Sequence, residues 1–162
     1  MKIELFKFGL KSYLKQRMIK IKNITAKETY AVRHPVLRQG KPIEYCAFDG
    51  DLLESTYHIG LFINNKLIGV TSLLISENPI FNEEKQYQLR GMGILDEFQG
   101  KGYGNLIIDY AKTLLKKKNI VFLWCNAREV AASFYTKNGF QITGNPFNIE
   151  TIGKHYIMYK RL

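Results

Sequence analysis

A glycine-rich loop between a strand-like run and a long amphipathic segment is the part of the sequence best suited to chemistry. It lies within residues 89 to 104 and carries Gly91, Gly93, Gly100, Gly102 and Gly104. The order strand, loop, helix places backbone N–H groups at a helix N-terminus, where the helix dipole favours an anion such as a phosphate. Glycine has no Cβ and reaches positive φ, so an anion can approach the backbone closely. The loop is therefore expected to bind a pyrophosphate.

The spacing of these glycines excludes two common phosphate loops. A Walker loop needs a glycine five residues before its Gly-Lys pair and a hydroxyl residue after it, but Leu95 and Gly102 occupy those places. A dinucleotide-binding fingerprint needs a third glycine. Asp96 and Asn105 stand where the two candidate repeats require that glycine. The pattern that remains is Q-x-x-G-x-G over residues 99 to 104.

A second motif lies downstream of an apolar run at residues 120 to 125, which is typical of a buried strand. The pattern A-x-x-F-Y-x-x-x-G-F follows over residues 131 to 140. Together, the two motifs resemble those of the GCN5-related N-acetyltransferase (GNAT) superfamily. The resemblance covers roughly residues 57 to 162 and, more weakly, residues 19 to 56. Taken without the second motif, the glycine loop has a plain strand-to-helix turn as its alternative interpretation.

The resemblance implies an α/β fold for the chain. It predicts a single GNAT-like N-acetyltransferase domain over residues 1 to 162, whose mixed, mostly antiparallel central sheet is flanked by helices on both faces. Residues 1 to 16 have no counterpart in the family pattern and are interpreted as an N-terminal extension. At 162 residues the chain is long enough for one domain with a real hydrophobic core.

Hydrophobic periodicity predicts the elements that position the motifs. Strands are expected at residues 18 to 22, 58 to 63, 67 to 75, 86 to 94, 120 to 125, 140 to 143 and 156 to 160. Helices are expected from residue 25 to 34, directly after the glycine loop, and from residue 130 to 137. The helix after the glycine loop has an apolar stripe that should face the sheet, formed by Leu106, Ile107, Tyr110, Ala111, Leu114 and Leu115.

Local signals set the ends of some elements. Thr25 and Glu28 have the spacing of a capping box at a helix start, and Pro35 is expected to end or kink that helix at His34. Asn64-Asn65 suits a tight hairpin turn, because Asn tolerates positive φ. Residues 39 to 56 are rich in Gly, Pro and Asp and are expected to form a loop.

Acetyl-CoA is the cosubstrate that the resemblance implies. Its pantetheine arm would pair with the backbone of Met92, Gly93 and Ile94, and the N–H of Ile94 would polarise the acetyl carbonyl. Asn126 would meet the pantetheine amide at the end of its strand. The pyrophosphate would be surrounded by the N–H groups of the loop and of the first helical turn, which belong to Gln99, Gly100, Lys101, Gly102, Tyr103, Gly104 and Asn105.

Tyr135 is the expected general acid, because the family places a tyrosine beside the coenzyme sulfur at this point of the second motif. A phenol has a pKa of roughly 10, so it is protonated at neutral pH and can protonate a departing thiolate. The alternative role for Tyr135 is that of an aromatic core residue on one face of a helix.

The general base is less well defined by the sequence. His58 and His155 lie in or beside strands and are candidates for contact with the acceptor, although strand histidines often serve only as hydrogen-bonded structure. Glu44, Asp49 and Asp51 could attract an amine or be solvated turn residues. An amine can also lose its proton to water without a dedicated base.

Composition limits the classes of protein to which the chain could belong. Hydrophobic residues make up 46% of the chain, which favours a globular fold over disorder. Cys46 and Cys125 show no metal or redox spacing, so reduced thiols in a cytoplasmic protein and no metal are expected. The charged N-terminal segment lacks the apolar core of a signal peptide, and no run is long enough to span a membrane.

The net charge of +10 raises nucleic acid as a partner. The basic residues are scattered, however, apart from a lysine group at positions 112 and 116 to 118, where cations complement the end of a helix dipole. No basic block is interleaved with aromatic residues as in single-strand binders. Nucleic acid is therefore not expected as a partner.

The sequence thus predicts an acetyl-CoA-dependent N-acetyltransferase that acts on a primary amine of a small molecule or protein by direct attack on the thioester. A non-catalytic coenzyme A-binding or sensing module on the same fold is the alternative, and a basic nucleic-acid-binding protein is a third reading. Related domains often pair, so a homodimer is one expected arrangement. Family resemblance assigns acceptor choice to residues 25 to 56 and 144 to 155, which show no recognisable substrate motif.

Overall fold

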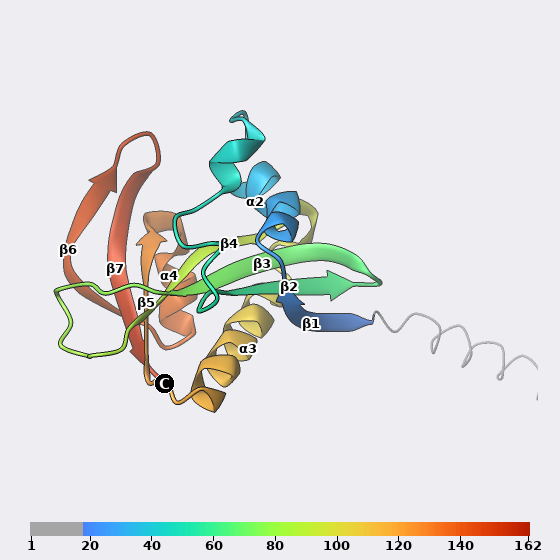
Figure 1. Cartoon of the computed structure of the whole chain (residues 1–162). Coiled ribbons are helices and arrows are strands. Elements are labelled where there is room, and N and C mark those ends of the chain that lie inside the picture. The colour runs from blue at the N-terminus through green and yellow to red at the C-terminus, as the bar shows by residue number, and fades with distance from the viewer. Residues whose placement is uncertain (1–17) are drawn as a thin grey trace, which may run out of the picture.

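The computed structural model describes residues 18–162, and the predicted N-terminal extension lies outside them. A seven-stranded sheet with the order β1-β2-β3-β4-β5-β7-β6 forms its centre (Figure 1). Neighbouring strands are antiparallel except β4 and β5, which are parallel. This confirms the predicted mixed, mostly antiparallel sheet. The strands are β1 (Ile19–Ile24), β2 (Tyr57–Ile63), β3 (Lys66–Ile75), β4 (Tyr87–Ile94), β5 (Phe122–Arg128), β6 (Gln141–Ile149) and β7 (Gly153–Arg161).

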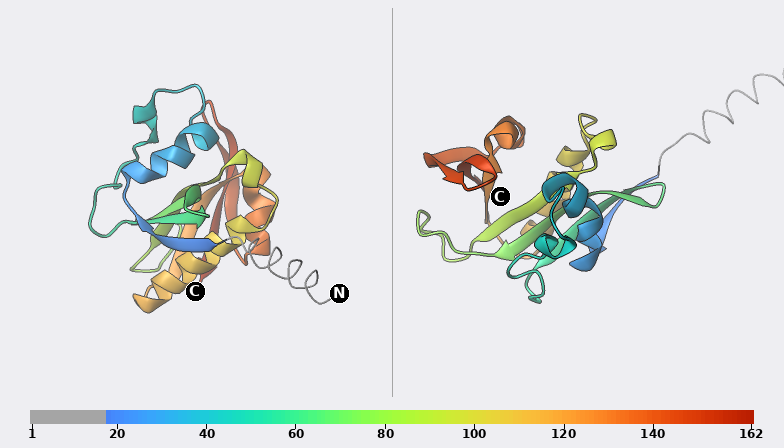
Figure 2. Two further views of the ribbon diagram at one scale, coloured as in Figure 1. Left: turned by 90° about the vertical axis from the view of Figure 1, so that its right-hand side faces the viewer. Right: turned by 90° about the horizontal axis from the view of Figure 1, so that it is seen from above.

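Helices cover both faces of this sheet, as predicted. In Figures 1 and 2, α2 lies on one face and α3 on the other. The helix α4 packs against β5 and β7, and its C-terminal Asn138 donates a 3.0 Å hydrogen bond to Asn105 at the start of α3. The three helices are α2 (Tyr30–Leu37), α3 (Tyr103–Lys117) and α4 (Glu129–Lys137). Short 3-10 turns occur at Lys27–Thr29, Ile43–Cys46 and Asp96–Phe98.

The local signals before α2 are partly confirmed. Thr25 N–H donates to the Glu28 carboxylate at 2.6 Å, and Glu28 N–H donates to Thr25 Oγ1 at 3.2 Å, which is the reciprocal pattern of a capping box. The expected helix end at His34 is wrong, since α2 includes Pro35 and continues to Leu37. A proline costs a helix the bond to the carbonyl four residues back, and here the helix ends only two residues later.

The β2–β3 hairpin turns at Asn64 and Asn65, which both have positive φ, 47° and 66°. Positive φ at both turn residues matches the right-handed twist of the strands, so the predicted tight turn is confirmed.

On α3 the predicted apolar stripe is correct except at its start. Leu106 is 38% exposed, whereas Ile108 is fully buried in its place. The helix is therefore rotated slightly from the orientation that the stripe implied.

The central sheet opens between β4 and β5. These strands pair only at Tyr87 with Leu123 and at Gln88 with Trp124, and then β5, β7 and β6 turn away from β4 (Figure 2). Within β4 the pairing with β3 shifts register beside Gly91, which has φ +58°. Such a bulge bends a strand and sharpens its twist. The bulge and the divergence together leave one edge of β4 without a neighbouring strand.

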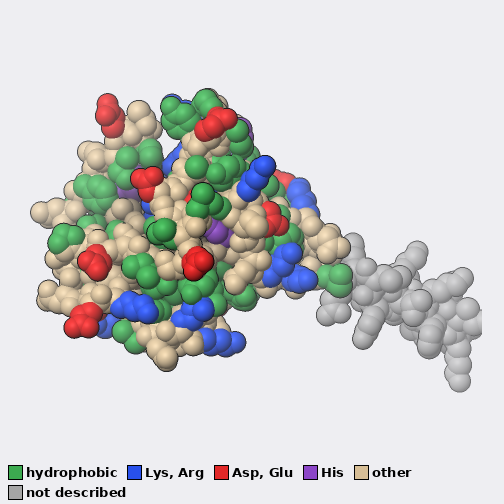
Figure 3. All heavy atoms as spheres, viewed as in Figure 1, with side chains coloured by type: hydrophobic (Ala, Val, Ile, Leu, Met, Phe, Trp, Pro, Cys, Tyr) green, Lys and Arg blue, Asp and Glu red, His purple; other side chains and the backbone are tan. Residues whose placement is uncertain are grey.

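Charged groups are spread over the surface. On the face shown in Figure 3, basic and acidic side chains are interspersed.

No helix in residues 18–162 has the length and apolarity needed to cross a bilayer. In the same part of the chain, no three His, Cys, Asp or Glu side chains are grouped as metal ligands.

Candidate active site

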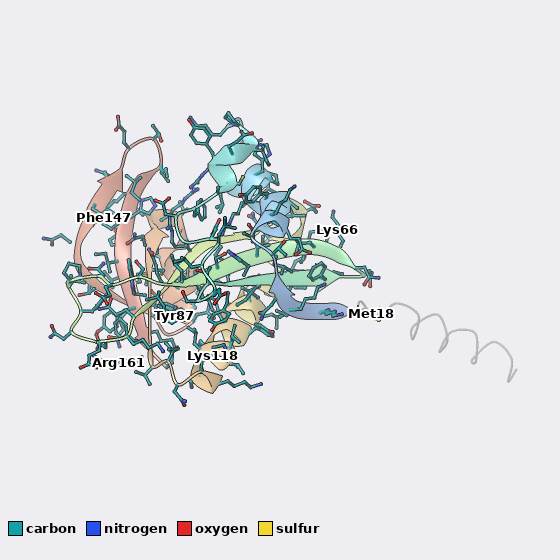
Figure 4. All side chains as sticks on the ribbon, viewed as in Figure 1. Met18, Lys66, Tyr87, Lys118, Phe147 and Arg161 are labelled. Carbon is teal, nitrogen blue, oxygen red and sulfur yellow. The ribbon has the colours of Figure 1, made fainter. Side chains whose placement is uncertain are left out.

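A cleft of about 230 Å³ occupies the opening between β4 and β5. Its floor is the β4 segment from Gln88 to Met92, and its far wall is formed by β5, α4 and the β6–β7 turn. The end of α2 and the loop after it close the third side, through Arg38 and Phe48. Figure 4 labels Tyr87, where β4 and β5 are still paired next to the cleft floor, and Phe147 on β6.

The backbone of Ile94 faces this opening. Leu95 N–H donates to Ile68 C=O at 2.8 Å, so the adjacent pair Ile94 and Gly69 is a non-hydrogen-bonded pair of the antiparallel ladder. The N–H of Ile94 therefore points away from β3, toward the side where β5 has diverged. A carbonyl oxygen lying along this edge of β4 would meet a free main-chain donor, as the sequence predicted for the acetyl group.

The glycine loop after β4 presents a bare backbone. Gly100 and Gly102 have φ of +71° and +82°, and a Cβ added to either would have no heavy atom within 4 Å. Within residues 18–162, the N–H groups of Gly100, Lys101, Gly102 and Gly104 donate no hydrogen bond to protein acceptors. Unpaired N–H groups at the start of a helix form an anion site. The loop thus has the geometry expected of a pyrophosphate cradle.

Two side chains of the loop hold its shape. The Gln99 amide donates to Ile94 C=O at 2.8 Å and to Asp96 Oδ1 at 3.0 Å, and Gln99 N–H donates to Asp96 C=O. Lys101 Nζ donates to the Glu97 carbonyl at 2.6 Å. The N–H of Gln99 is therefore already used, unlike those of the following residues, and its side chain ties the loop to the end of β4.

The first turn of α3 contributes packing as well as donors. A Cβ on Gly104 would lie 3.0 Å from the Phe134 ring, so a larger residue would push α3 away from α4. Tyr103 is buried and its ring lies 6.3 Å from that of Phe98. Asn105 N–H donates to Gly102 C=O, and its side chain is bound by Asn138. Asn105 therefore helps to fix the loop rather than leaving its N–H free.

Tyr135 is buried in the far wall of the cleft. Its hydroxyl lies 3.8 Å from Met92 Sδ on β4, so the phenol reaches across the opening to the strand that carries Ile94. Burial, and then the proximity of Cys125, raise the pKa of Tyr135 well above its usual value. Burial also raises the pKa of the Cys125 thiol. Tyr135 is therefore held protonated, which is the state that a general acid needs.

His155 and Asn126 also line the cleft, but His58 does not. His155 Nδ1 lies 2.7 Å from the Gly153 carbonyl. A carbonyl only accepts hydrogen bonds, so Nδ1 carries the proton and Nε2 of the neutral ring holds a lone pair. Asn126 is exposed at the cleft side of β5. The sequence offered His58 and His155 as equal candidates for contact with the acceptor, and only His155 lines the cleft.

His58 belongs to a buried polar network under the cleft. Its ring nitrogens lie 2.6 Å from Ser72 Oγ and 2.8 Å from Asp51 C=O, so both are occupied. The guanidinium of Arg33, fully buried, donates to both carboxylate oxygens of Asp51 and to Ser72. Asp51 was expected as a solvated turn residue or an amine-attracting group, and it is instead the counter-ion of Arg33. The one buried side-chain nitrogen or oxygen without a hydrogen-bond partner in residues 18–162 is Arg33 Nε, which faces Gly91.

Asp51→Asn is expected to lower the free energy of unfolding by about 3 to 5 kcal/mol, because it leaves the buried guanidinium of Arg33 without a counter-ion. Urea denaturation measures this loss. Glu97→Gln is the matched control, since it breaks the exposed ion pair with Lys66, and exposed pairs contribute little. Equal midpoints for both variants would show that Arg33 does not depend on Asp51.

Comparison with known proteins decides the family. The model of the Acetyltransferase (GNAT) family matches residues 18–140. The chain is a member of the GNAT family. The uncharacterized N-acetyltransferase YitI of Bacillus subtilis (strain 168) is 35% identical over 145 residues, which cover 90% of this chain and 97% of that protein. By family and fold the chain is an N-acetyltransferase.

Solved GNAT-type structures share the fold at low identity. A crystal structure from Lactobacillus plantarum has a TM-score of 0.73 at 18% identity, covering 89% of this chain and 98% of that one. The PaiA N-acetyltransferase from Thermoplasma acidophilum, solved with coenzyme A, has a TM-score of 0.65 at 23% identity, covering 90% and 99%. In this GNAT chain, the opening lies along the edge of β4 that diverges from β5, and the glycine loop follows the end of that strand.

Proposed function

We propose that the chain transfers the acetyl group of acetyl-CoA to a primary amine of a small molecule or protein, by direct attack of the amine on the thioester. One observation carries the proposal. Tyr135 lines the opening between β4 and β5 and lies 3.8 Å from Met92 Sδ, the N–H of Ile94 points toward the same side of β4, and the glycine loop with its unpaired N–H groups follows the end of that strand. Among structural relatives, a GNAT acetyltransferase from Elizabethkingia anophelis was solved with acetyl-CoA bound.

Each group has one task in this reaction. The N–H groups of Gly100, Lys101, Gly102 and Gly104 bind the pyrophosphate, and the edge of β4 from Met92 to Ile94 binds the pantetheine arm. Asn126 binds a pantetheine amide from the β5 side. The N–H of Ile94 donates to the carbonyl oxygen, and that hydrogen bond strengthens as negative charge develops on the oxygen.

Two proton transfers accompany the reaction, one from Tyr135 to the leaving sulfur and one from the attacking amine to a base. The amine nitrogen bonds to the acetyl carbon, and the C–S bond then breaks. Tyr135 gives its proton to the departing sulfur, and the phenolate regains a proton from solvent. The attacking nitrogen loses one proton to His155 Nε2, which is the one unprotonated ring nitrogen at the cleft wall.

His155→Ala is expected to lower kcat by about 100-fold, the usual contribution of a general base. Added imidazole should restore part of the lost rate, because a free ring can occupy the vacated space and accept the proton. Steady-state rates with and without imidazole make the measurement. A loss of activity that imidazole does not relieve would assign His155 to structure, leaving water as the base.

Release of free thiol from acetyl-CoA in the presence of a panel of amines tests the activity itself. An amine-dependent rate supports the proposal. Coenzyme binding without turnover on any amine would favour the non-catalytic coenzyme A-binding module instead. A cytoplasmic location, a homodimer and the absence of nucleic-acid binding stay predictions of the sequence.

A further inference from the structure

Three arginines from distant parts of the chain meet at the cleft. Arg38 ends α2, Arg90 lies on β4 and Arg128 ends β5, and all three line the cleft together with Tyr135 and His155. In the printed sequence they are isolated basic residues. Only the fold brings them to one place.

Phe48 fixes the position of two of them. The guanidinium carbons of Arg38 and Arg90 lie 5.0 Å and 4.9 Å from the centre of its ring, and that of Arg33 lies 4.1 Å away. Guanidinium groups stack favourably on aromatic rings at such distances. Arg38 is further held by hydrogen bonds from Nε to Tyr45 C=O and from Nη1 to Leu37 C=O. The cationic groups are therefore held in place at the cleft.

The three arginines differ from Arg33 in their carboxylate partners. In residues 18–162, Arg33 is paired with Asp51, but Arg38, Arg90 and Arg128 form no ion pair with a carboxylate. Burial lowers the pKa of Arg38, and repulsion by Arg128 adds to that effect.

Arg90 lies near two carboxylate groups. Burial also lowers its pKa, and the nearby Asp51 and Asp49 offset part of this. Asp51 is already committed to Arg33, and Arg90 reaches only the backbone carbonyl of Asp49, at 3.5 Å. An anion in the cleft would thus remove a standing repulsion among three partly desolvated cations.

The arginines lie next to the reacting groups. Arg128 is directly opposite His155 in the β5–β7 ladder, and directly opposed side chains have Cβ atoms about 4.5 to 5.5 Å apart. A cleft of about 230 Å³ has room for a small molecule that contacts both Arg128 and His155. An anionic group held by Arg128 would therefore belong to the same small molecule as the amine near His155.

We propose that the acceptor is a small amine that carries a carboxylate, such as a free amino acid, and that Arg38, Arg90 and Arg128 bind this carboxylate. The proposal rests on the acetyltransferase function proposed above. It concerns the acceptor and not the coenzyme, because the pyrophosphate cradle at Gly100 to Gly104 follows the C-terminal end of β4, beyond Ile94, whereas Arg90 precedes the bulge at Gly91.

The experiment compares matched amines with the full chain and saturating acetyl-CoA. Amino acids are paired with their decarboxylated amines, and phosphoethanolamine represents a phosphate-bearing amine. We expect kcat/KM to be about 100-fold higher for the carboxylate-bearing member of a pair, because a site built for a polar group strongly rejects the analogue that lacks it. Arg90→Gln and Arg128→Gln should reduce this preference at least about tenfold through KM.

Three controls distinguish an effect on carboxylate binding from a general loss of acetyltransferase activity. Arg161→Gln, on β7 outside the cleft, should leave the preference unchanged. Acetyl-CoA affinity should be the same in all three variants, and succinate should inhibit the wild type competitively against the amine. The last result does not depend on any variant being folded.

The outcomes separate two failures. The carboxylate site would be overturned if kcat/KM were equal or higher for the decarboxylated amines and if the arginine variants did not change this ratio. The acetyltransferase function would be left intact. A preference for phosphoethanolamine would overturn the carboxylate as the recognised group in favour of a phosphate. An absence of amine-dependent thiol release with every amine in the panel would overturn the proposed function and this inference together.

Discussion

Gly102→Val is expected to weaken acetyl-CoA binding by about 100-fold or more. Gly102 has φ +82° at the start of α3, and a branched side chain there would occupy the space in front of the free N–H groups. Losing one or two charge-assisted hydrogen bonds costs roughly 3 kcal/mol, which is about 100-fold in affinity. Calorimetric titration of the variant with acetyl-CoA measures the effect.

The matched control for this variant is Gly40→Val. Gly40 also has positive φ, +76°, with no heavy atom within 4 Å of an added Cβ, and it lies in the turn after α2. Both variants carry the same backbone strain, on the order of 1 to 3 kcal/mol, so both should melt lower. Only Gly102→Val should lose the coenzyme, and unchanged affinity in that variant would refute the loop assignment.

Tyr135→Phe should lower kcat by about 100-fold and leave acetyl-CoA affinity nearly unchanged. The hydroxyl is the group that protonates the departing thiolate, and general acids contribute at least about 100-fold to rates. The aromatic ring, which packs against Phe134 and Phe140, is retained. Steady-state kinetics with the preferred amine provides the test.

Tyr159→Phe removes a comparable hydroxyl as the control, since Tyr159 donates to Gln141 away from the cleft. The pH dependence adds a second readout. Because the pKa of Tyr135 is raised above its usual value of 10, the wild-type phenol stays protonated as the pH rises toward 10. Deprotonation of Tyr135 therefore should not reduce kcat in that range. Wild-type turnover in Tyr135→Phe would remove the phenol from the mechanism.

Much of the fold follows from local sequence signals. The strands, the Asn64-Asn65 turn and the Thr25 capping box each depend on a few neighbouring residues, and the structure confirms them. The ends of elements were less predictable. Pro35 lies inside α2, and β6 extends to Ile149 rather than ending at Thr143, because pairing with β7 continues past a register shift.

The coenzyme side of the site was predictable for a physical reason. Its donors are main-chain N–H groups, so only the glycines and their spacing before a helix matter, and these are consecutive in the sequence. The role of Gln99 was not visible in that spacing, because its side chain acts on the Ile94 carbonyl through the folded loop.

The acceptor side could not be predicted in the same way. Arg38, Arg90 and Arg128 are brought together by three different elements, and nothing in their neighbours marks them. Asp51 lies in a loop that composition suggests is solvated, yet it is the counter-ion of a buried arginine. Such long-range pairs depend on the tertiary structure, and a single sequence does not contain their distances.

Amide-resolved NMR of the isotope-labelled chain during titration with acetyl-CoA shows whether backbone N–H groups bind the coenzyme. We expect the largest shifts and the strongest protection from hydrogen exchange at the backbone N–H groups of Ile94, Gly100, Lys101, Gly102 and Gly104. Saturable binding that leaves those amides unchanged and perturbs other regions would contradict it.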